Sequence, residues 1–324
     1  MASEFLQTLR DKLRTKHRAY KTEQAYVGWV VRFIRFHKMQ HPQSMNTFHM
    51  EKFIVHLANS GVSSPTQNQA IAALKFMFRE MTTVELGDVR SLYGKRDVHI
   101  PTPALSVDEV RSILCRLKGM YHIVGRLLYG GGLRLMECLR LRVKDVDFES
   151  QTITLRNTKS KRDRVTVLPK SVIEPLKLHL AKVKAQHKQD FAHGFGSVEM
   201  PGLLAKKCPK AQYEWGWQYI FPSSQLSRDP RSGVVRRHHL FETSVQKVIK
   251  RAAMDSGITK PVSPHKFRHA FATHLYEAGE DIIKIQKLLG HKDLKTTMEY
   301  IHVGSVITGT VSPADRLDTQ WVSN

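Results

Sequence analysis

The amino-terminal part of the chain places apolar and polar residues with a helical period. Apolar side chains recur every three or four residues in four successive segments, separated by short polar joints. The pattern predicts helices around residues 5–13, 22–39, 47–61 and from residue 64 onward. In the last of these, Ser64-Pro65 has the pattern of an N-cap followed by proline at the first helical position. We therefore expect residues 1–90 to form a helical, four-helix domain.

The helical periodicity stops over residues 91–104. Two prolines, Pro101 and Pro103, disfavour a helix there and stiffen the chain. We interpret this stretch as an extended linker that leads into a second domain over residues 105–302.

Helical signals return where the second domain begins. Ser106 and Glu109 form a capping-box pattern, which predicts the start of a helix. Glycines at 130–132 permit a tight turn, so we expect Arg134 at the start of the next helix. Later helices are predicted over residues 171–188, 241–256, 264–278 and 281–290.

Residues 143–168 change to the two-residue alternation of β-strands. Residues 151–155 and 164–168 alternate on either side of a basic turn, which predicts a hairpin with Lys159 at or near its tip. The fold class is therefore mainly α with a small β-sheet (α+β).

Two regions of the second half lack a regular pattern. Residues 190–240 contain scattered glycines, prolines and aromatic residues, and we expect them to be irregular. Residues 303–324 are left as a C-terminal tail whose glycines and proline make a helix doubtful.

The charge of the chain indicates a polyanionic partner. Its 324 residues include 51 Lys+Arg against 29 Asp+Glu, a net charge of +22. DNA fits that excess, although a solvated basic face is the alternative. The hydrophobic content of 41% is enough for real cores.

The sequence contains no membrane or export signal. No run approaches the ~20 apolar residues of a membrane-spanning helix, and the first residues lack a signal-peptide pattern. Three cysteines without a Cys-x-x-Cys pair fit a reducing cytosol. We expect a cytoplasmic protein with no membrane partner, and Cys115 and Cys138 on buried helix faces.

Separate segments of the chain carry residues suited to phosphodiester transfer. This reaction needs a nucleophile, cations that neutralise the phosphorane, and a proton for the leaving oxygen. Arginine stays charged and bonds phosphate oxygens bidentately. The candidates are Arg134, Lys159, His265, Arg268, His291 and Tyr300.

Each candidate has a chemical role and an alternative without function. His265 and Arg268 lie three residues apart near a helix start, a position that favours an anion. Tyr300 is the candidate nucleophile, and His265 or His291 could take its proton. Lys159 is the candidate general acid because neighbouring cations make its proton easier to donate, with Lys161 as a competitor. Taken singly, such residues are more often surface or packing residues, and only the combination favours chemistry.

Together, and in this order, these segments resemble the tyrosine recombinase (phage-type integrase) family. Its hallmarks are an Arg in Gly-x-Arg-xx-Glu, a hairpin Lys, His-x-x-Arg, Leu-Gly-His, and a Tyr nine residues after that His. The resemblance covers residues 104–302, and the helical N-terminal part resembles the family's core-binding (SAM-like) domain. One departure is Gly132, where the family more often has Thr or Ser.

The family resemblance implies a reaction and an assembly. It implies site-specific DNA recombination through a 3′-phosphotyrosine, by a homotetramer on DNA, with no metal and no cofactor. Arg134 and Arg268 would clamp the phosphate, His291 would be a further donor, and Glu137 would orient an arginine or pack structurally.

A narrower resemblance is to the integron integrases of bacteria. It is carried by an insertion at about residues 190–222, with Met200-Pro and the run Glu214-Trp-x-Trp217-Gln-Tyr-Ile-Phe-Pro222. It implies recombination between a duplex integron site and cassette sites folded from one DNA strand into imperfect hairpins. Bases extruded from such hairpins would need flat stacking partners. The candidates are Trp215, Trp217, Pro230, His238 and His239, with a core role as the alternative for the tryptophans.

Four other functions stay open at this point. They are a type IB topoisomerase, a phage-type integrase acting on ordinary duplex sites, an inactive DNA-binding protein, and a zinc hydrolase. The last would use His265, His269 and His274, but no His-Glu-x-x-His motif accompanies them.

Overall fold

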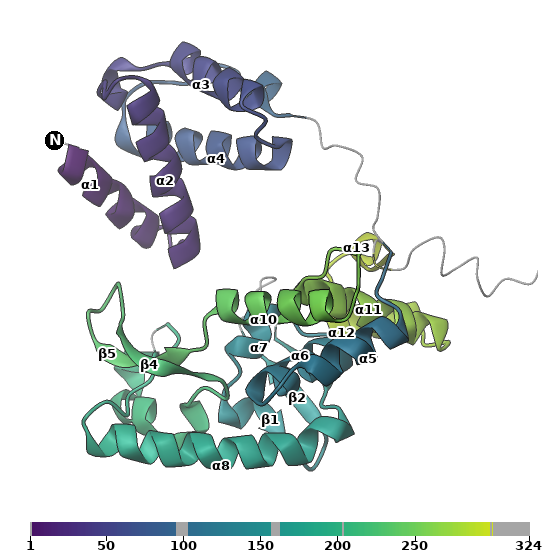
Figure 1. Ribbon diagram of the computed structural model, residues 1–324. Coiled ribbons are helices and arrows are strands. Elements are labelled where there is room, and N and C mark those ends of the chain that lie inside the picture. Colours follow the sequence, from purple (N-terminus) through teal and green to yellow (C-terminus); the bar gives the residue numbers. More distant parts are fainter. Residues whose placement is uncertain (1, 95–102, 157–162, 203, 299, 301–324) are drawn as a thin grey trace, which may run out of the picture. The chain divides into compact units, whose positions relative to one another are not determined.

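The structure is a computed structural model that describes residues 2–94, 103–156, 163–202, 204–298 and 300. The chain divides into two compact units, Met1–Ile100 and Pro101–Asn324, with the division inside the predicted linker. Each unit has its own hydrophobic core. Figure 1 shows the helices and strands of both units.

The first unit contains the four predicted helices. They are α1 (Ala2–Thr15), α2 (Tyr20–Phe36), α3 (Thr47–Asn59) and α4 (Ser64–Met81), with short 3-10 turns at Pro42–Ser44 and Arg90–Leu92. Phe33 lies at the centre, with its ring edge-on to Phe53 at 5.5 Å and to Phe78 at 6.0 Å between ring centroids.

Helix ends in the first unit differ from the prediction by a few residues. α2 ends three residues early because Lys38 and Met39 adopt positive φ angles, which no helix continues through. The N-cap of α4 is Ser63, so Ser64 is helical and does not cap it as predicted.

The second unit is mainly helical with two small antiparallel sheets. Its longer helices are α5 (Val107–Arg116), α6 (Met120–Gly130), α8 (Lys170–Ala192), α10 (Glu242–Asp255), α11 (Pro264–Glu277) and α12 (Ile282–Leu289). Short helices are α7 (Leu135–Leu139), α9 (Leu204–Lys207) and α13 (Leu294–Met298), with 3-10 turns at Val143–Asp145, Pro209–Tyr213 and Trp215–Trp217. α6 packs against α5, α8 and α11 and carries much of the core.

Two cap signals in the second unit are confirmed, whereas the N-cap of α8 is Pro169, so Ser171 is helical and does not cap that helix as predicted. The Ser106 hydroxyl accepts from the Glu109 backbone N–H, and the Glu109 carboxylate accepts from the Ser106 N–H, at 3.2 and 2.7 Å. Asp281, two residues after Gly279, accepts from two N–H groups at the start of α12. The capping of these helices therefore follows directly from local sequence.

The first sheet contains the predicted hairpin and one short extra strand. Its order is β1 (Val146–Asp147), β2 (Thr152–Leu155) and β3 (Arg164–Val167). β2 and β3 are antiparallel, with Thr152 opposite Val167 and Leu155 opposite Arg164. The strands are confirmed, while the tip with Lys159 lies outside the described residues.

The second sheet corrects the expectation that residues 190–240 are irregular. β4 (Pro222–Arg228) and β5 (Val235–His239) form an antiparallel hairpin. Its strands are mostly polar, so they lack the apolar alternation that marks a strand in sequence. Its turn is stabilised by the Asp229 carboxylate, which accepts from the backbone N–H groups of Arg231 and Ser232.

Two further findings concern burial. Cys138 is buried as expected, but Cys115 is exposed, because the buried face of α5 passes through Val110, Ile113 and Leu114. Among the described helices, none is long and apolar enough to span a membrane.

Candidate active site

Arg134 is positioned by the predicted glycine turn. α6 ends at Gly130, Gly132 has a φ of +62°, and Arg134 becomes the N-cap of α7. A Cβ on Gly132 would lie 2.5 Å from the Phe271 ring, so glycine is needed both for the backbone angle and for the close approach. Gly132 is also the glycine of the Gly-x-Arg-xx-Glu hallmark, so the departure expected at this position is wrong and Gly132 matches the family pattern.

Glu137 holds Arg134 by both its backbone and its side chain. The Arg134 N–H donates to Glu137 Oε2 at 2.9 Å, and its guanidinium donates to Oε1 at 2.7 Å. Burial alone would raise the pKa of Glu137, but the hydrogen bonds and charge of Arg164, helped by Arg134, lower it to about 2. Glu137 is therefore an ionised anchor for two arginines, which fits the orienting role expected for it.

Arg164 is a site residue that we did not single out from the sequence. Its side chain is 7% exposed and donates to both oxygens of Glu137, at 2.9 and 2.8 Å. Its Nε donates to the Leu288 carbonyl at the end of α12. In the sequence it is one of several basic residues beside a predicted strand, and no local signal indicates that it is buried.

Arg268 is completely buried beside the Arg134 turn. It donates to the Gly132 carbonyl and the Leu289 carbonyl, both at 2.6 Å, and to His291 Nε2 at 3.0 Å. Burial and the charges of Arg134 and Arg164 lower its pKa to about 10, so it remains cationic at neutral pH. Its Nε–H is buried and has no partner among the described residues.

His291 is neutral, and its neighbours fix its tautomer. Because Arg268 donates to Nε2, the ring proton must be on Nδ1, which donates to the Thr297 hydroxyl at 3.0 Å. Burial and the charges of Arg268, Arg134 and Arg164 lower the pKa of His291 to about 3. Both ring nitrogens already have hydrogen-bond partners. His291 can therefore donate to a phosphate, as expected, only after it gives up its contact with Arg268.

Tyr300 lies in hydrogen-bond contact with a histidine base. Its hydroxyl is 2.9 Å from His265 Nε2, and its ring lies 5.3 Å from His269 and 5.1 Å from His291 between centroids. Burial first, then the charges of Arg268, Arg134 and Lys266, lower the pKa of His265. A neutral His265 can accept the phenol proton, so the predicted nucleophile and base are adjacent.

The remaining predicted catalytic residue is not placed. Lys159 and its competitor Lys161 both lie outside the described residues. The structure therefore brings together Arg134, His265, Arg268, His291 and Tyr300 from α7, α11 and the segment after α12.

The histidines of the zinc-hydrolase alternative do not gather at one point. His265 contacts Tyr300, and His274 Nδ1 lies 2.9 Å from the Tyr129 hydroxyl. In the described part of the chain, three metal-ligand side chains come together only elsewhere, at Glu199, Asp229 and His238. The geometry gives no support to a zinc site at the catalytic histidines.

The candidate stacking residues lie on and near the β4–β5 hairpin. Pro230 is exposed in its turn. His238 and His239 follow each other on β5 with ring centroids 4.7 Å apart, and both rings lie against Tyr219. Burial chiefly lowers the pKa of His239 to about 4, so its ring is neutral at physiological pH.

The two candidate tryptophans have different environments. Trp217 is half-buried against a small cluster that includes Tyr219, and the Lys144 Nζ lies 2.9 Å from its ring centroid. Trp215 packs against the main core of the unit. Each tryptophan therefore makes some of the core contacts that the alternative role predicts. A stacking role for either residue stays a prediction.

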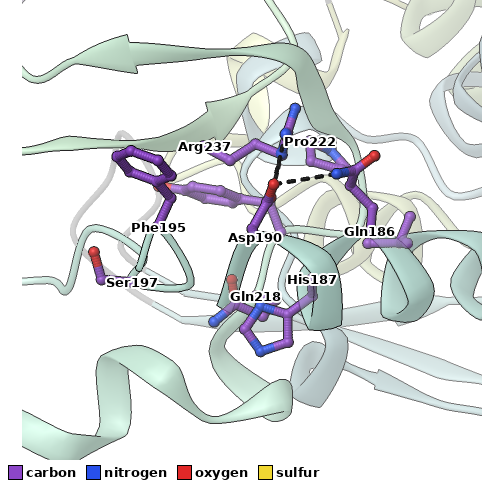
Figure 2. Close-up of a pocket in the computed structure, with 10 residues that line it drawn as sticks. Gln186, His187, Asp190, Phe195, Ser197, Gln218, Pro222 and Arg237 are labelled. Atoms are coloured by element: carbon purple, nitrogen blue, oxygen red, sulfur yellow. Dashed lines mark hydrogen bonds and ion pairs between the residues drawn. The ribbon is translucent and has the colours of Figure 1, made fainter. Parts of the chain in front are cut away.

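A small pocket marks where the hairpin meets the end of α8. Figure 2 shows Asp190 between Arg237 and Gln186, with Phe195 and Pro222 also lining the pocket. Arg237 donates to both carboxylate oxygens of Asp190, at 2.5 and 2.8 Å. This ion pair fixes β5 to α8, so Arg237 serves to hold the hairpin in place.

Two protein-family models match this chain. The phage integrase family model matches residues 104–305, and the model of the phage integrase N-terminal SAM-like domain matches residues 5–88. An integrase/recombinase of Escherichia coli and one of Pseudomonas aeruginosa are each 42% identical over 314 residues, covering 96% of this chain and 93% of theirs. The crystal structure of XerH site-specific recombinase bound to difH substrate matches with a TM-score of 0.61 at 18% identity, over 95% of this chain and 84% of that one.

This chain belongs to the phage integrase family. It is a tyrosine recombinase, an enzyme that cleaves DNA and transfers strands through a tyrosine intermediate. The predicted fold class, a SAM-like helical domain followed by a mainly helical catalytic domain, is confirmed.

Proposed function

We propose that this recombinase is an integron integrase in which Tyr300 is the nucleophile. The observation that carries the catalytic part is the contact between the Tyr300 hydroxyl and His265 Nε2, beside a buried arginine with an unpaired N–H. DNA as the partner is supported by the net charge of +22 and by XerH, a fold neighbour crystallised with its difH substrate.

The proposed reaction is two successive transesterifications. Tyr300 Oη attacks the scissile phosphorus and passes its proton to His265, while the bond from phosphorus to the 5′ oxygen breaks. Lys159 protonates that leaving oxygen, which gives a 3′-phosphotyrosine and a free 5′-hydroxyl. The 5′-hydroxyl of a partner strand then attacks the phosphotyrosine and releases Tyr300, so the bond energy is retained. Exchange between two duplexes requires four protomers, hence a homotetramer.

The two arginines stabilise the charge of this reaction. Arg134 is partly exposed while its carboxylate partner is buried, so it is anchored and still accessible to a phosphate. Arg268 contributes its buried Nε–H and its charge. Fixed donors around a developing phosphorane lower the barrier because they need no reorganisation during the reaction.

The hairpin substrate is proposed from the β4–β5 hairpin and from Trp217, which lies in the insertion just before it. His239 presents a neutral ring, Pro230 is exposed in the turn, and Trp217 is partly exposed next to cationic side chains. Flat rings beside cations are the arrangement that binds unpaired bases. The Asp190–Arg237 ion pair holds this region rigid, which reduces the entropy lost when an extruded base binds.

Substrate trapping tests both parts of the proposal. The wild-type chain and Tyr300→Phe are incubated in EDTA with a labelled duplex suicide site or a folded single-strand hairpin site, then denatured. We expect a covalent protein–DNA band with wild type and none with Tyr300→Phe, with more product on the hairpin. A band from both proteins would contradict Tyr300 as nucleophile.

Two substitutions separate the hairpin proposal from action on ordinary duplex sites. Trp217→Ala and His239→Ala should weaken hairpin binding about tenfold while leaving capture of a nicked duplex largely intact. Equal loss on both substrates would contradict base stacking and favour the duplex alternative. A type IB topoisomerase would relax supercoiled DNA and would not join two sites.

A further inference from the structure

Arg164 joins parts of the site that are far apart in sequence. It begins β3, and three of its N–H groups are used by two partners, Glu137 and the Leu288 carbonyl. Its side chain is 7% exposed, so its hydrogen-bond partners are protein groups and not solvent. Among the described residues, Arg268 also lies against both Glu137 and the end of α12, but its nitrogen is 3.8 Å from Glu137 Oε2, too far for a hydrogen bond.

The first connection leads to Arg134. Glu137 binds Arg164 through both oxygens and uses the same two oxygens to hold the Arg134 backbone and guanidinium. If Arg164 were shorter or lacked the planar fork, Glu137 could rotate and carry Arg134 with it. A lysine keeps the charge but cannot bond both oxygens in this geometry.

The second connection leads to His291. Leu288 supplies one of the last carbonyls of α12, and Gly290 turns the chain with a φ of +65° immediately before His291. A Cβ on Gly290 would lie 2.5 Å from Arg164 Cδ, so the arginine stem packs closely against this turn. Arg268 binds the next carbonyl, that of Leu289. Arg164 and Arg268 therefore bond the last carbonyls of α12, at the negative end of the helix dipole.

We propose that Arg164 is a positioning residue that fixes Arg134 and His291 relative to each other. It acts through Glu137 on one side and through the end of α12 on the other, without touching the reacting atoms. This inference rests on the proposed function, in which Arg134 and His291 act on one phosphate. A misplacement of about 1 Å in such a pair costs on the order of a hundredfold in rate.

The primary variant is Arg164→Lys, with Arg156→Lys as its control. Arg156 flanks the other strand of the same hairpin and pairs with Asp145 at 3.1 Å, but its side chain is 50% exposed. The single-turnover rate of covalent complex formation, the DNA dissociation constant and the melting temperature are measured for each. Arg164→Lys should lose about a hundredfold in rate while DNA affinity and melting temperature stay close to wild type. Arg156→Lys should match wild type in every measurement.

A neutral substrate distinguishes positioning from a general loss of structure. A methylphosphonate at the scissile position removes one negative charge, so cleavage depends less on the placement of arginines. The defect of Arg164→Lys should shrink to about tenfold or less on this substrate. A defect of the same size on both substrates would overturn the inference, because a merely structural role does not respond to phosphate charge.

Further outcomes distinguish a failure of the positioning role of Arg164 from a failure of the proposed function. If Arg164→Lys does not melt cooperatively, Glu137→Gln replaces it, because it weakens the same bridge and should show the same dependence on substrate charge. An active wild type with an unimpaired Arg164→Lys would refute the positioning role alone. A wild type that forms no covalent complex on either substrate would refute the proposed function.

Discussion

His265 and Tyr300 show how single residues acquire chemistry from their surroundings. A phenol and an imidazole are ordinary groups, but here they are 2.9 Å apart and next to two guanidinium groups. The same cations that would stabilise a phosphate also disfavour protonated His265, so His265 is neutral and can accept a proton at neutral pH. The chemistry therefore depends on the combination and not on any one residue.

The pH dependence of cleavage follows from the lowered pKa of His265. The base must be neutral, so the rate should be insensitive to protonation of His265 near neutrality and fall only as the pH drops below the usual histidine value of ~6.5. His265→Gln should lose about a hundredfold in rate and lose this acid limb. The measurement is the single-turnover cleavage rate against pH at saturating protein.

An exposed histidine provides the control for this profile. His193 is exposed, and its ring bonds to the Gln189 carbonyl at the end of its own helix, so His193→Gln should keep the wild-type profile. An acid limb that persists unchanged in His265→Gln would show that another group accepts the proton.

At the scale of elements, sequence predicted what local rules determine. Helices with strong periodicity and caps, such as those starting at Ser106 and Asp281, appear with the expected caps. The β4–β5 hairpin was missed because its strands are polar and held by tertiary contacts such as Asp190–Arg237. Arg164 was missed for a related reason, since only the folded chain shows that Glu137 and α12 surround it.

Most of the candidate residues that the structure brings together could be singled out from the sequence because they lie beside recognisable local signals. Arg134 follows a glycine turn, and His265 follows Ser-Pro at a helix start. The tautomer of His291 and its contact with Arg268 could not be predicted, because they depend on distances between elements remote in sequence.

The turn between α6 and α7 gives a prediction at this scale. Gly132→Ala combines a positive φ, which costs about 1–2 kcal/mol for a non-glycine residue, with a clash against Phe271 that costs about 1–3 kcal/mol. We expect a loss of about 2–5 kcal/mol in unfolding free energy, measured by urea denaturation. Covalent complex formation should fall as well, because the Gly132 carbonyl binds Arg268 and Arg134 is two residues away.

Gly279→Ala separates strain from clash. Gly279 also has a positive φ, +86°, but an added Cβ would meet nothing within 4 Å. Its substitution should cost only the backbone term, about 1–2 kcal/mol, and leave cleavage unchanged. Equal losses for the two variants would contradict the role assigned to the Phe271 contact.

At the scale of the whole molecule, charge and division into two units are the main features. The net charge of +22 belongs to a chain whose two units each have a separate core. A chain with this excess of cations is expected to bind the phosphates of DNA. Such binding is expected to be dominated by phosphate contacts, with base recognition added to it.

The salt dependence of DNA binding tests this electrostatic interpretation. If the chain neutralises six to ten phosphates, its affinity should fall about 10³- to 10⁵-fold between 50 and 200 mM salt. A linear plot of log affinity against log salt, measured by fluorescence anisotropy, gives the number of phosphates. An affinity that does not change with salt would contradict a phosphate-dominated interface.

Identification of the residue that becomes linked to DNA is the most direct test of the central claim. Wild-type protein is trapped on a suicide substrate, digested with nuclease and trypsin, and the nucleotide adduct is mapped by tandem mass spectrometry. We predict the adduct on Tyr300, in the peptide that begins after Lys295. An adduct on another residue, such as Tyr129 or Tyr276, would contradict the assignment of Tyr300 as the nucleophile.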